Sequence, residues 1–383
     1  MSWQQSDENS ERIKFVGDWL KDEFDFSYLC ERYGISRKTG YKLINRYKVE
    51  GEDAFKAKSH CRHYHPNKTD AAIEARLLEL KYRYPYWGPR KLRSWLLNEA
   101  PDEAWPAAST IGELLKRHHL VNARRYRKRT PGYSEPFGSC LAANDIWSAD
   151  FKGQFRMGNK DYCYPLTVTD NYSRYLLLCK GLERPTLEAT RKGFEHLFRE
   201  YGLPKAIRTD NGQPFASVGI GGLTRLSVWF LKLGILPERI EPGCPQQNGR
   251  HERMHRTLKQ ETTKPSGKDL PSQQSQFDRF RSIYNDERPH EALDGRRPAE
   301  IYTGSERVYP SKISEIVYPD AFAIRKIKTN GNMKWQGKQY YISESLVHEP
   351  VGLEVIDDGR AILHFAGLKL GLVDARTDRI IRI

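Results

Sequence analysis

The sequence predicts a multidomain α+β protein, in which two helical modules precede a mixed α/β domain and a small C-terminal β-barrel. The chain has 383 residues, more than the roughly 250–300 at which a single hydrophobic core stops growing. Helical periodicity dominates the N-terminal part, strand and helix patterns alternate in the middle, and short strands with glycine turns fill the end. The predicted domains span 8–60, 66–121, 145–302 and 305–383, and a basic linker spans 122–144.

Composition favours a folded protein that binds a polyanion. Hydrophobic residues make up 38% of the chain, enough for folded cores, and the formal net charge is +14. Nucleic acid is therefore the leading partner, and an acidic membrane surface is the alternative. No apolar run approaches the roughly 18 residues of a spanning helix, and the N-terminus is polar. These features predict a cytoplasmic protein without a membrane partner.

The six cysteines are scattered and form no C-x-x-C pair, which predicts free thiols in a reducing compartment. The segment SHCRHYH (59–65) mixes His and Cys and raises the possibility of a zinc site. It lacks a second ligand pair at zinc-finger spacing, so a basic linker is the favoured interpretation.

The segment FSYLCERYGISRKTGYKLINRY (26–47) predicts a helix-turn-helix. Leu29 and Cys30 are expected to face inward, Gly34 to adopt a left-handed turn, and Ser36 to cap the second helix. The second helix presents polar and basic residues that are expected to contact a major groove, namely Arg37, Lys38, Thr39 and Lys42. A helical hairpin with a solvated basic face is the alternative. An apolar stripe of Ile13, Val16 and Leu20 precedes this segment.

A second helical module has the same character. Pro89 suits the first turn of a helix, and Thr110 with Glu113 predicts a capping box. DNA contact and a solvated face are both open for its basic residues. Between Lys116 and Arg129 there are then seven basic residues and no acid. Arg124 and Arg125 in this stretch are expected to track DNA phosphates, and a merely solvated connector is the alternative.

The middle domain is expected to hold a mixed sheet covered by helices. Three strands in hairpin order are followed by a helix, a fourth strand ending at RTDNG, a second helix, a short strand and a long helix. In the C-terminal domain, the turns Asn330-Gly331, Gln336-Gly337 and Asp358-Gly359 separate strand-type segments, which predicts the small barrel.

Three carboxylates occupy positions suited to metal-dependent chemistry on phosphates. Asp150 lies in an apolar strand, where an ionised carboxylate is costly unless it is paired or bound to a metal. Asp210 ends the fourth strand, at the edge of an α/β sheet where ligands bind. Glu252 lies in the segment PQQNGRHERMHRTLK (245–259), which is expected to start a long helix. Taken singly, each aspartate is as well explained as a turn or cap residue.

Helical spacing predicts a functional stripe on the long helix. Positions three, four and seven residues after Glu252 share its face, and they hold His255, Arg256 and Lys259. These three are expected to hold DNA phosphates near the carboxylates. Asn248, in the Gln-Gln-Asn-Gly segment before the helix, is expected to contact DNA as well.

The segments WSADFKG, RTDNG and PQQNGRHERMHRTLK resemble the three signature segments of DDE transposases with a retroviral-integrase-type core. More narrowly, the chain resembles bacterial insertion-sequence transposases, including the closing segments YNDERPHEAL and PAEIY. The resemblance implies an RNase H-like core. It places the metal-binding carboxylates at Asp150, Asp210 and Glu252, with two Mg²⁺ ions and Mn²⁺ as a substitute.

Two features depart from retroviral integrases. Asp210 and Glu252 are 42 positions apart, a longer spacing that we attribute to a loop at SVGIGGLTR (217–225). The His/Cys zinc module is absent, and the helix-turn-helix pair takes its place. The acids that compete with the triad for a metal-binding role are Asp145, Asp170, Glu241 and Glu261. Asp170 is expected to serve its turn instead, and Glu261 lies off the face of Glu252.

The resemblance implies a transposase that cuts transposon ends and joins the 3′-OH to target DNA by two-metal phosphoryl transfer. Its expected partners are double-stranded DNA and further copies of the same chain in a synaptic complex, in a nucleoid-associated location. A DNA-binding regulator with an inactive core is one alternative. A nuclease that cuts without joining is the other.

Overall fold

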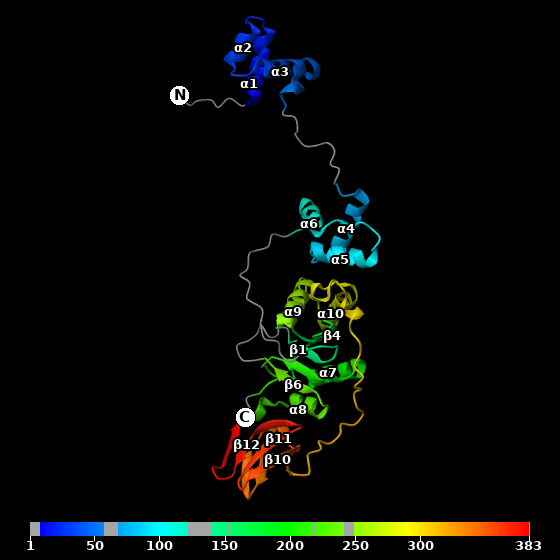
Figure 1. Cartoon of the computed structure of the whole chain (residues 1–383), viewed down its shortest axis with the longest axis vertical. Coiled ribbons are helices and arrows are strands. Elements are labelled where there is room, and N and C mark those ends of the chain that lie inside the picture. Colours follow the sequence, from blue (N-terminus) through cyan, green and yellow to red (C-terminus); the bar gives the residue numbers. More distant parts are fainter. Residues whose placement is uncertain are drawn as a thin grey trace. The chain divides into compact units, whose positions relative to one another are not determined.

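The computed structural model describes residues 8–56, 68–121, 140–151, 153–210, 212–217, 219–240 and 249–382. The chain divides into two compact units, Met1–Lys68 and Thr69–Ile383, whose elements are labelled in Figure 1. No helix among the described residues is long and apolar enough to cross a membrane.

The first unit is a helix-turn-helix preceded by one helix. Its helices are α1 (Glu8–Leu20), α2 (Phe26–Arg32) and α3 (Arg37–Glu50). Gly34 has a φ of 64°, in the left-handed region that a residue without Cβ adopts at little cost. The Ser36 hydroxyl accepts a hydrogen bond from the Thr39 N–H at 3.2 Å, which caps α3. The turn and the cap both have the predicted form.

The core of the first unit comes from all three helices. It buries Phe15, Val16, Leu29, Cys30 and Ile44. The apolar stripe predicted for α1 is only partly buried, because the side chains of Ile13 and Leu20 are 53% and 57% exposed. Phe15 packs into the core instead, next to Val16.

Three helices begin the second unit, namely α4 (Ala71–Arg83), α5 (Pro89–Glu99) and α6 (Ala108–Arg117). Pro89 occupies the first turn of α5, as predicted. The predicted capping box is wrong. The helix already begins at Ala108, and Glu113 pairs with Lys116 at 2.6 Å. The apolar residues Ile111, Leu114 and Leu115 are nevertheless fully buried.

These helices bind the segment 287–297, which follows the core domain's last long helix. Glu287 accepts hydrogen bonds from Arg83, at 3.0 Å, and from the Tyr84 hydroxyl. Lys91 Nζ donates to the Pro289 carbonyl at 3.2 Å, and Ser94 Oγ donates to the Gly295 carbonyl at 3.2 Å. The second helical module is therefore attached to the core through the segment that the sequence marks as a closing motif.

His290 lies inside this attachment, and we expect it to make stability depend on pH. Burial, together with the charges of Lys91 and Arg288, lowers the pKa of His290 from 6.5 to about 3. The unfolded chain therefore binds a proton near pH 6.5 that the folded chain does not. The contribution of His290 to the free energy of unfolding is therefore complete above about pH 6.5. It falls between pH 6.5 and pH 3, by up to about 1.4 kcal/mol per pH unit.

The urea midpoint of unfolding is measured for the wild type and for His290→Gln at a series of pH values between 3 and 8. This range covers the pKa of His290 in both the folded and the unfolded chain. The variant should lose part of the decline at acid pH. His196→Gln is the control, because His196 lies on an exposed face of α7 (Leu187–Tyr201). An equal decline in His290→Gln and wild type would contradict the assignment.

The centre of the second unit is a mixed sheet in the predicted order of strands and helices. Its strands are β1 (Ile146–Phe151), β2 (Phe155–Arg156), β3 (Tyr162–Asp170), β4 (Leu176–Leu182), β5 (Ala206–Thr209) and β6 (Leu236–Arg239). β3 pairs antiparallel with β1 and β4, whereas β1, β5 and β6 are parallel. The first predicted strand is divided into β1 and β2.

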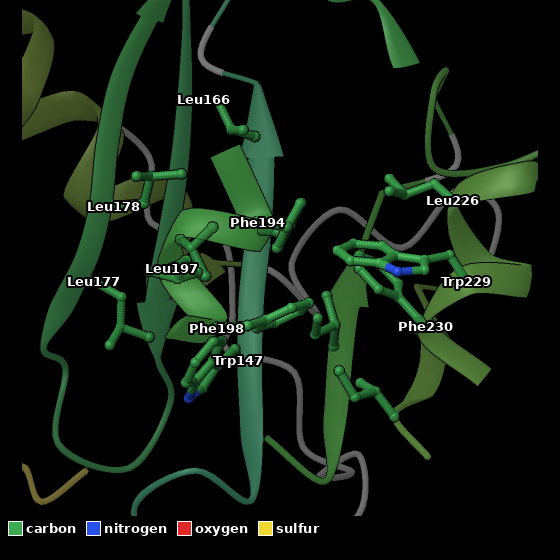
Figure 2. Packing of buried hydrophobic residues seen from close by; sticks show 14 of the residues in the cluster. Trp147, Leu166, Leu177, Leu178, Phe194, Leu197, Phe198, Leu226, Trp229 and Phe230 are labelled. Atoms are coloured by element: carbon green, nitrogen blue, oxygen red, sulfur yellow. The ribbon is translucent and has the colours of Figure 1, made fainter. Parts of the chain in front are cut away.

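Helices cover the two faces of this sheet. Figure 2 shows Phe194, Leu197 and Phe198 of α7 together with Trp147 of β1, and Trp229 and Phe230 of α8 (Arg225–Lys232) beside them. The other face is covered by α9 (Gly249–Thr262) and α10 (Leu270–Ser282), through a cluster that includes Met254 and Phe277. Side chains alternate between the two faces along β1 and β3. Trp147 and Leu166, for example, face α7 and α8, whereas Thr167 faces α9.

The C-terminal part forms an open sheet, so the predicted barrel is not confirmed. Its strands are β7 (Phe322–Lys326), β8 (Asn332–Trp335), β9 (Lys338–Tyr341), β10 (Pro350–Asp357), β11 (Arg360–Phe365), β12 (Leu368–Asp374) and β13 (Arg379–Arg382). The five-stranded sheet runs β13-β12-β11-β10-β7, and β8 pairs only with β9 among the described strands. The turns Gln336-Gly337 and Asp358-Gly359 join the paired strands β8–β9 and β10–β11, whereas Asn330-Gly331 lies between β7 and β8, which do not pair with each other. Local turns do not determine whether the outer strands meet.

The segment predicted as an excess loop, residues 217–225, connects the core to this sheet. It contains a 3-10 helix at Ile220–Gly222. Ile220 and Leu223 are buried in the same apolar cluster as Leu370 of β12 and Val228 of α8. The additional residues between Asp210 and Glu252 therefore hold the C-terminal sheet against α8.

Candidate active site

Asp150 and Asp210 lie at the same edge of the sheet. β1 and β5 are parallel neighbours, and the last pair in register is Ala149 with Thr209. Asp150 and Asp210 each follow that pair, so their backbones are about one strand spacing, roughly 4.8 Å, apart. The side chain of Asp150 is 18% exposed, and Asp210 accepts a hydrogen bond from the Gly212 N–H at 3.1 Å. Two carboxylates that are distant in sequence are thus brought together by strand pairing.

Glu252 lies in the first turn of α9, on its exposed side. The opposite side of the helix is buried and carries His251, Met254, His255 and Leu258. These residues place α9 across the face of the sheet to which Asp150 and Thr167 point. The helix that carries the third predicted carboxylate is therefore attached directly to the strand that carries the first.

A buried polar network makes this attachment. The hydroxyl of Thr167, on β3, lies 2.7 Å from His251 Nε2 and 2.6 Å from His255 Nε2. It also donates to the Asp150 carbonyl at 3.1 Å. Thr169, two residues further along β3, lies 2.9 Å from His251 Nδ1. We call these four side chains, Thr167, Thr169, His251 and His255, the His–Thr network.

Proton counting determines the roles in the His–Thr network. A hydroxyl has one proton, and Thr167 must give it to the Asp150 carbonyl, which can only accept. Both histidines therefore donate their Nε2–H to the Thr167 oxygen. Burial lowers the pKa of His251 to about 3, so its ring is neutral and its Nδ1 accepts from Thr169.

His255 has a second role in the site. Its Nδ1 lies 3.6 Å from Asp150 Oδ2, a contact longer than a hydrogen bond. The side chains of Asp150, His251 and His255 together offer ligand atoms within 4.8 Å of one another. The Nε2 atoms of the two histidines are already bonded to Thr167. We therefore interpret the cluster as a support for Asp150.

The four residues predicted to share one face of α9 differ in their exposure to solvent. Glu252, Arg256 and Lys259 are exposed, whereas His255 is only 4% exposed. The helical spacing was correct, but the stripe spans the boundary between the solvent and the sheet. A phosphate contact by His255 stays a prediction, and its partners in the structure are Thr167 and Asp150.

The competing acids that the structure describes have other partners. Asp170 is fully buried and accepts hydrogen bonds from the N–H groups of Asn144 and Ser173 and from the Ser173 hydroxyl. Asp145 accepts from the Leu141 and Ala142 N–H groups, and Glu261 pairs with Arg288 at 2.7 Å. Glu241 lies outside the described residues. The turn role predicted for Asp170 is what the structure shows.

The residues predicted to contact DNA from the first unit are all on the surface of α3. Arg37, Lys38, Thr39 and Lys42 are exposed, and their contact with DNA stays a prediction. Arg124, Arg125 and Asn248 lie outside the described residues.

Thr167, Thr169 and His251 were not predicted as site residues from the sequence. A signal for them was present. The segment TVTD places two threonines on one face of a strand, and RHERMH places two histidines four residues apart on one face of a helix. Nothing local indicates that these two faces meet.

Family models match both the helical modules and the central domain of the chain. The family described as Integrase core domain matches residues 141–245 and 233–298. A Helix-turn-helix domain family matches residues 11–62, and a Homeodomain-like domain family matches residues 39–115.

Similar proteins include two from bacterial insertion elements. The IS407 uncharacterized 31.7 kDa protein of Burkholderia multivorans is 27% identical over 243 residues, which cover 62% of this chain and 82% of that protein. The IS476 uncharacterized 39.2 kDa protein of Xanthomonas euvesicatoria is 28% identical over 247 residues, covering 62% of this chain and 66% of that protein. The Gag-Pol polyprotein of Baboon endogenous virus is 31% identical over 49% of this chain but only 10% of its own length.

Solved structures similar to the chain include two from retroviruses. The HTLV-2 integrase catalytic core domain in complex with magnesium is 19% identical, covers 43% of this chain and 99% of its own, and has a TM-score of 0.35. The simian T-cell lymphotropic virus intasome in complex with a PP2A regulatory subunit is 16% identical, covers 80% of this chain and 98% of its own, and has a TM-score of 0.38.

Proposed function

We propose, since this chain combines an integrase core domain with helix-turn-helix domains, that it is a DNA transposase. It would bind the terminal repeats of a transposon, cut the ends and join the 3′-OH to target DNA. The observation that supports this most directly is that strand pairing brings Asp150 and Asp210 to one edge of the sheet. Glu252 lies on the helix that crosses the face of β1.

These three carboxylates would hold two Mg²⁺ ions, with Mn²⁺ as a substitute. Oxygen ligands are those that Mg²⁺ prefers, and aspartates on adjacent strands offer them from a rigid sheet, so the donor set fits. When bound, the ions activate the attacking oxygen and offset the charge of the transferred phosphate.

The protein's own side chains would position the DNA. Arg256 and Lys259 are exposed on α9, one and two turns beyond Glu252, and would contact phosphates beside the reacting one. The His–Thr network would hold the backbone of Asp150 in place. The exposed face of α3, with Arg37, Lys38, Thr39 and Lys42, would enter the major groove of a terminal repeat.

The remaining predicted contacts complete this proposal. Arg124 and Arg125 would track the DNA backbone between the helical modules and the core, and Asn248 would contact the strand near Glu252. Because two DNA ends must be held together, a synaptic complex would contain more than one copy of the chain. A DNA substrate places the protein with the nucleoid in the bacterial cytoplasm.

The test begins with a search for inverted repeats on either side of the gene, and an end-labelled duplex that carries such a repeat is then the substrate. With Mg²⁺ or Mn²⁺, the full chain should release a 3′-OH at the repeat and form longer joined products with a second duplex. A reaction containing a chelator is the control. Absence of both products, from protein that binds the repeat, would contradict a transposase.

The same assay distinguishes a transposase from a nuclease and from a DNA-binding regulator, because each would give different products. A nuclease on the same fold would give the cut ends without joined products. A regulator with an inactive core would bind the repeats without either product. The presence of all three carboxylates favours catalysis, because a protein that only binds DNA has no need of a carboxylate in a buried strand.

A further inference from the structure

Two arginines from different parts of the chain converge on one carbonyl oxygen. Arg174 ends the turn after β3, and Arg250 is the second residue of α9. Arg174 Nη1 donates to the Asn171 carbonyl at 2.6 Å, and Arg250 Nη1 donates to the same oxygen at 3.4 Å. The two Nη1 atoms are therefore at most about 6 Å apart, a distance at which like charges repel appreciably near a protein surface.

No carboxylate within the described part of the chain forms an ion pair with either guanidinium. The acids nearby have other partners: Asp145 pairs with Lys205, Glu261 pairs with Arg288, and Asp170 is buried in its own turn. Burial lowers the pKa of Arg174, and the charge of Arg250 lowers it further. By contrast, Arg199, Arg208 and Arg288 each lie next to a glutamate. Two positive charges are thus held together without an ion pair to a described carboxylate, and the buried Asp170 offsets only part of the effect on the pKa of Arg174.

The carbonyl that holds the pair is rigidly placed. The Asn171 side chain exchanges hydrogen bonds with the Ser148 hydroxyl, at 2.9 and 3.1 Å. The backbone N–H of Asn171 donates to the Ile146 carbonyl at 3.0 Å. Ser148 is two residues before Asp150 on the same face of β1, a separation of about 7 Å along the strand. The arginine pair is therefore fixed to the strand that carries the first proposed metal ligand.

Further positive charges lie around this pair. Arg253 is exposed on α9, three residues beyond Arg250. Lys91 of α5 lies near Arg253: burial and the charges of Arg288 and Arg253 lower the pKa of Lys91, and Glu291 and Glu261 raise it, with a net value of about 8. Arg253 thus adds one positive charge next to the pair, on the same helix as Arg250.

We propose that Arg174 and Arg250 bind a phosphodiester of duplex DNA, beside the three carboxylates. Guanidinium groups match phosphate oxygens with two parallel hydrogen bonds, and an anion between them removes their mutual repulsion. The amino end of α9, where Arg250 lies, adds its own preference for an anion. That the phosphate belongs to DNA rests on the proposed function.

The test compares Arg174→Gln, Arg250→Gln and the double variant with Lys192→Gln. Lys192 is an exposed residue of α7, the helix that packs on the opposite face of the sheet, and its replacement removes the same charge as either single arginine variant. Binding of a short mixed-sequence duplex is measured by fluorescence anisotropy over a range of KCl concentrations. The double variant should bind about tenfold more weakly at moderate salt, with a log Kd against log[KCl] slope smaller by about one.

Arg250 is exposed, so changes there keep the fold even if Arg174→Gln disturbs its turn. Arg250→Lys should keep most of the salt slope, and Arg250→Glu should weaken binding more than Arg250→Gln. If the variants at both positions bind like Lys192→Gln, the proposed phosphate site is wrong.

The proposed function can fail separately. Wild-type protein that binds DNA through these arginines but neither cuts nor joins it would overturn the transposase and leave the phosphate site. Wild-type protein that cuts and joins, with variants that bind like Lys192→Gln, would overturn the site alone.

Discussion

Asp150→Asn is expected to reduce metal-dependent cleavage and joining by at least about a thousandfold, since it removes a charged ligand from a two-metal site. The substitution keeps the size and the backbone of the residue. DNA binding should be unchanged or slightly tighter, because one negative charge is removed next to the phosphates. A second measurement does not depend on activity: the rise in melting temperature on adding Mg²⁺ should shrink in the variant.

Asp145→Asn is the matched control for this prediction. Asp145 immediately precedes β1, whereas Asp150 is its fifth residue, and its carboxylate binds the Leu141 and Ala142 N–H groups. The control should keep catalysis and the response to Mg²⁺, whatever it does to stability. Full activity in Asp150→Asn would remove the proposed catalytic role of this residue.

Thr167→Val is expected to destabilise the second unit by about 3 kcal/mol, although it leaves the volume of the core unchanged. The valine cannot accept from the Nε2–H groups of His251 and His255 or donate to the Asp150 carbonyl. Two buried N–H groups then lose their partner, at roughly 1–3 kcal/mol each. The free energy of unfolding from urea denaturation measures the loss.

Thr190→Val is the control for Thr167→Val. Thr190 is equally buried, but its hydroxyl only donates to the Thr186 carbonyl, at 2.7 Å. That carbonyl keeps the Thr190 N–H as a partner at 3.0 Å, so this substitution should cost well under about 1 kcal/mol. Thr167→Val should also raise the Mg²⁺ concentration needed for half-maximal activity, because Asp150 loses its support. Equal stability of the two variants would show that the His–Thr network contributes little.

Much of the local structure could be predicted from the sequence. The cap at Ser36 and the left-handed Gly34 depend on groups within four residues, and both were found as expected. The order of strands and helices in the core also followed from periodicity and turns. One local prediction failed. Thr110 and Glu113 had the spacing of a capping box, but α6 already begins at Ala108.

The candidate site was predictable only in part. Asp150, Asp210 and Glu252 were selected from their positions in the strands and the helix together with the resemblance to DDE transposases, and their role as metal ligands stays a prediction. The side chains that support these carboxylates could not be predicted, because the residues in contact are far apart in the sequence. Thr167 and His255, for example, are 88 positions apart.

The sequence by itself determined the periodicities, the cap at Ser36, the positive charge and the positions of the acids that we propose as metal ligands. Each of these is a property of residues separated by a few positions. Only the tertiary structure decided that β1 pairs with β5, that His255 faces the sheet while Glu252 faces the solvent, and that the C-terminal strands stay open. It also brought Arg174 and Arg250 to one carbonyl. The physical reason is that strand pairing and helix docking are chosen by the burial of whole faces, and no local pattern specifies which two faces will meet.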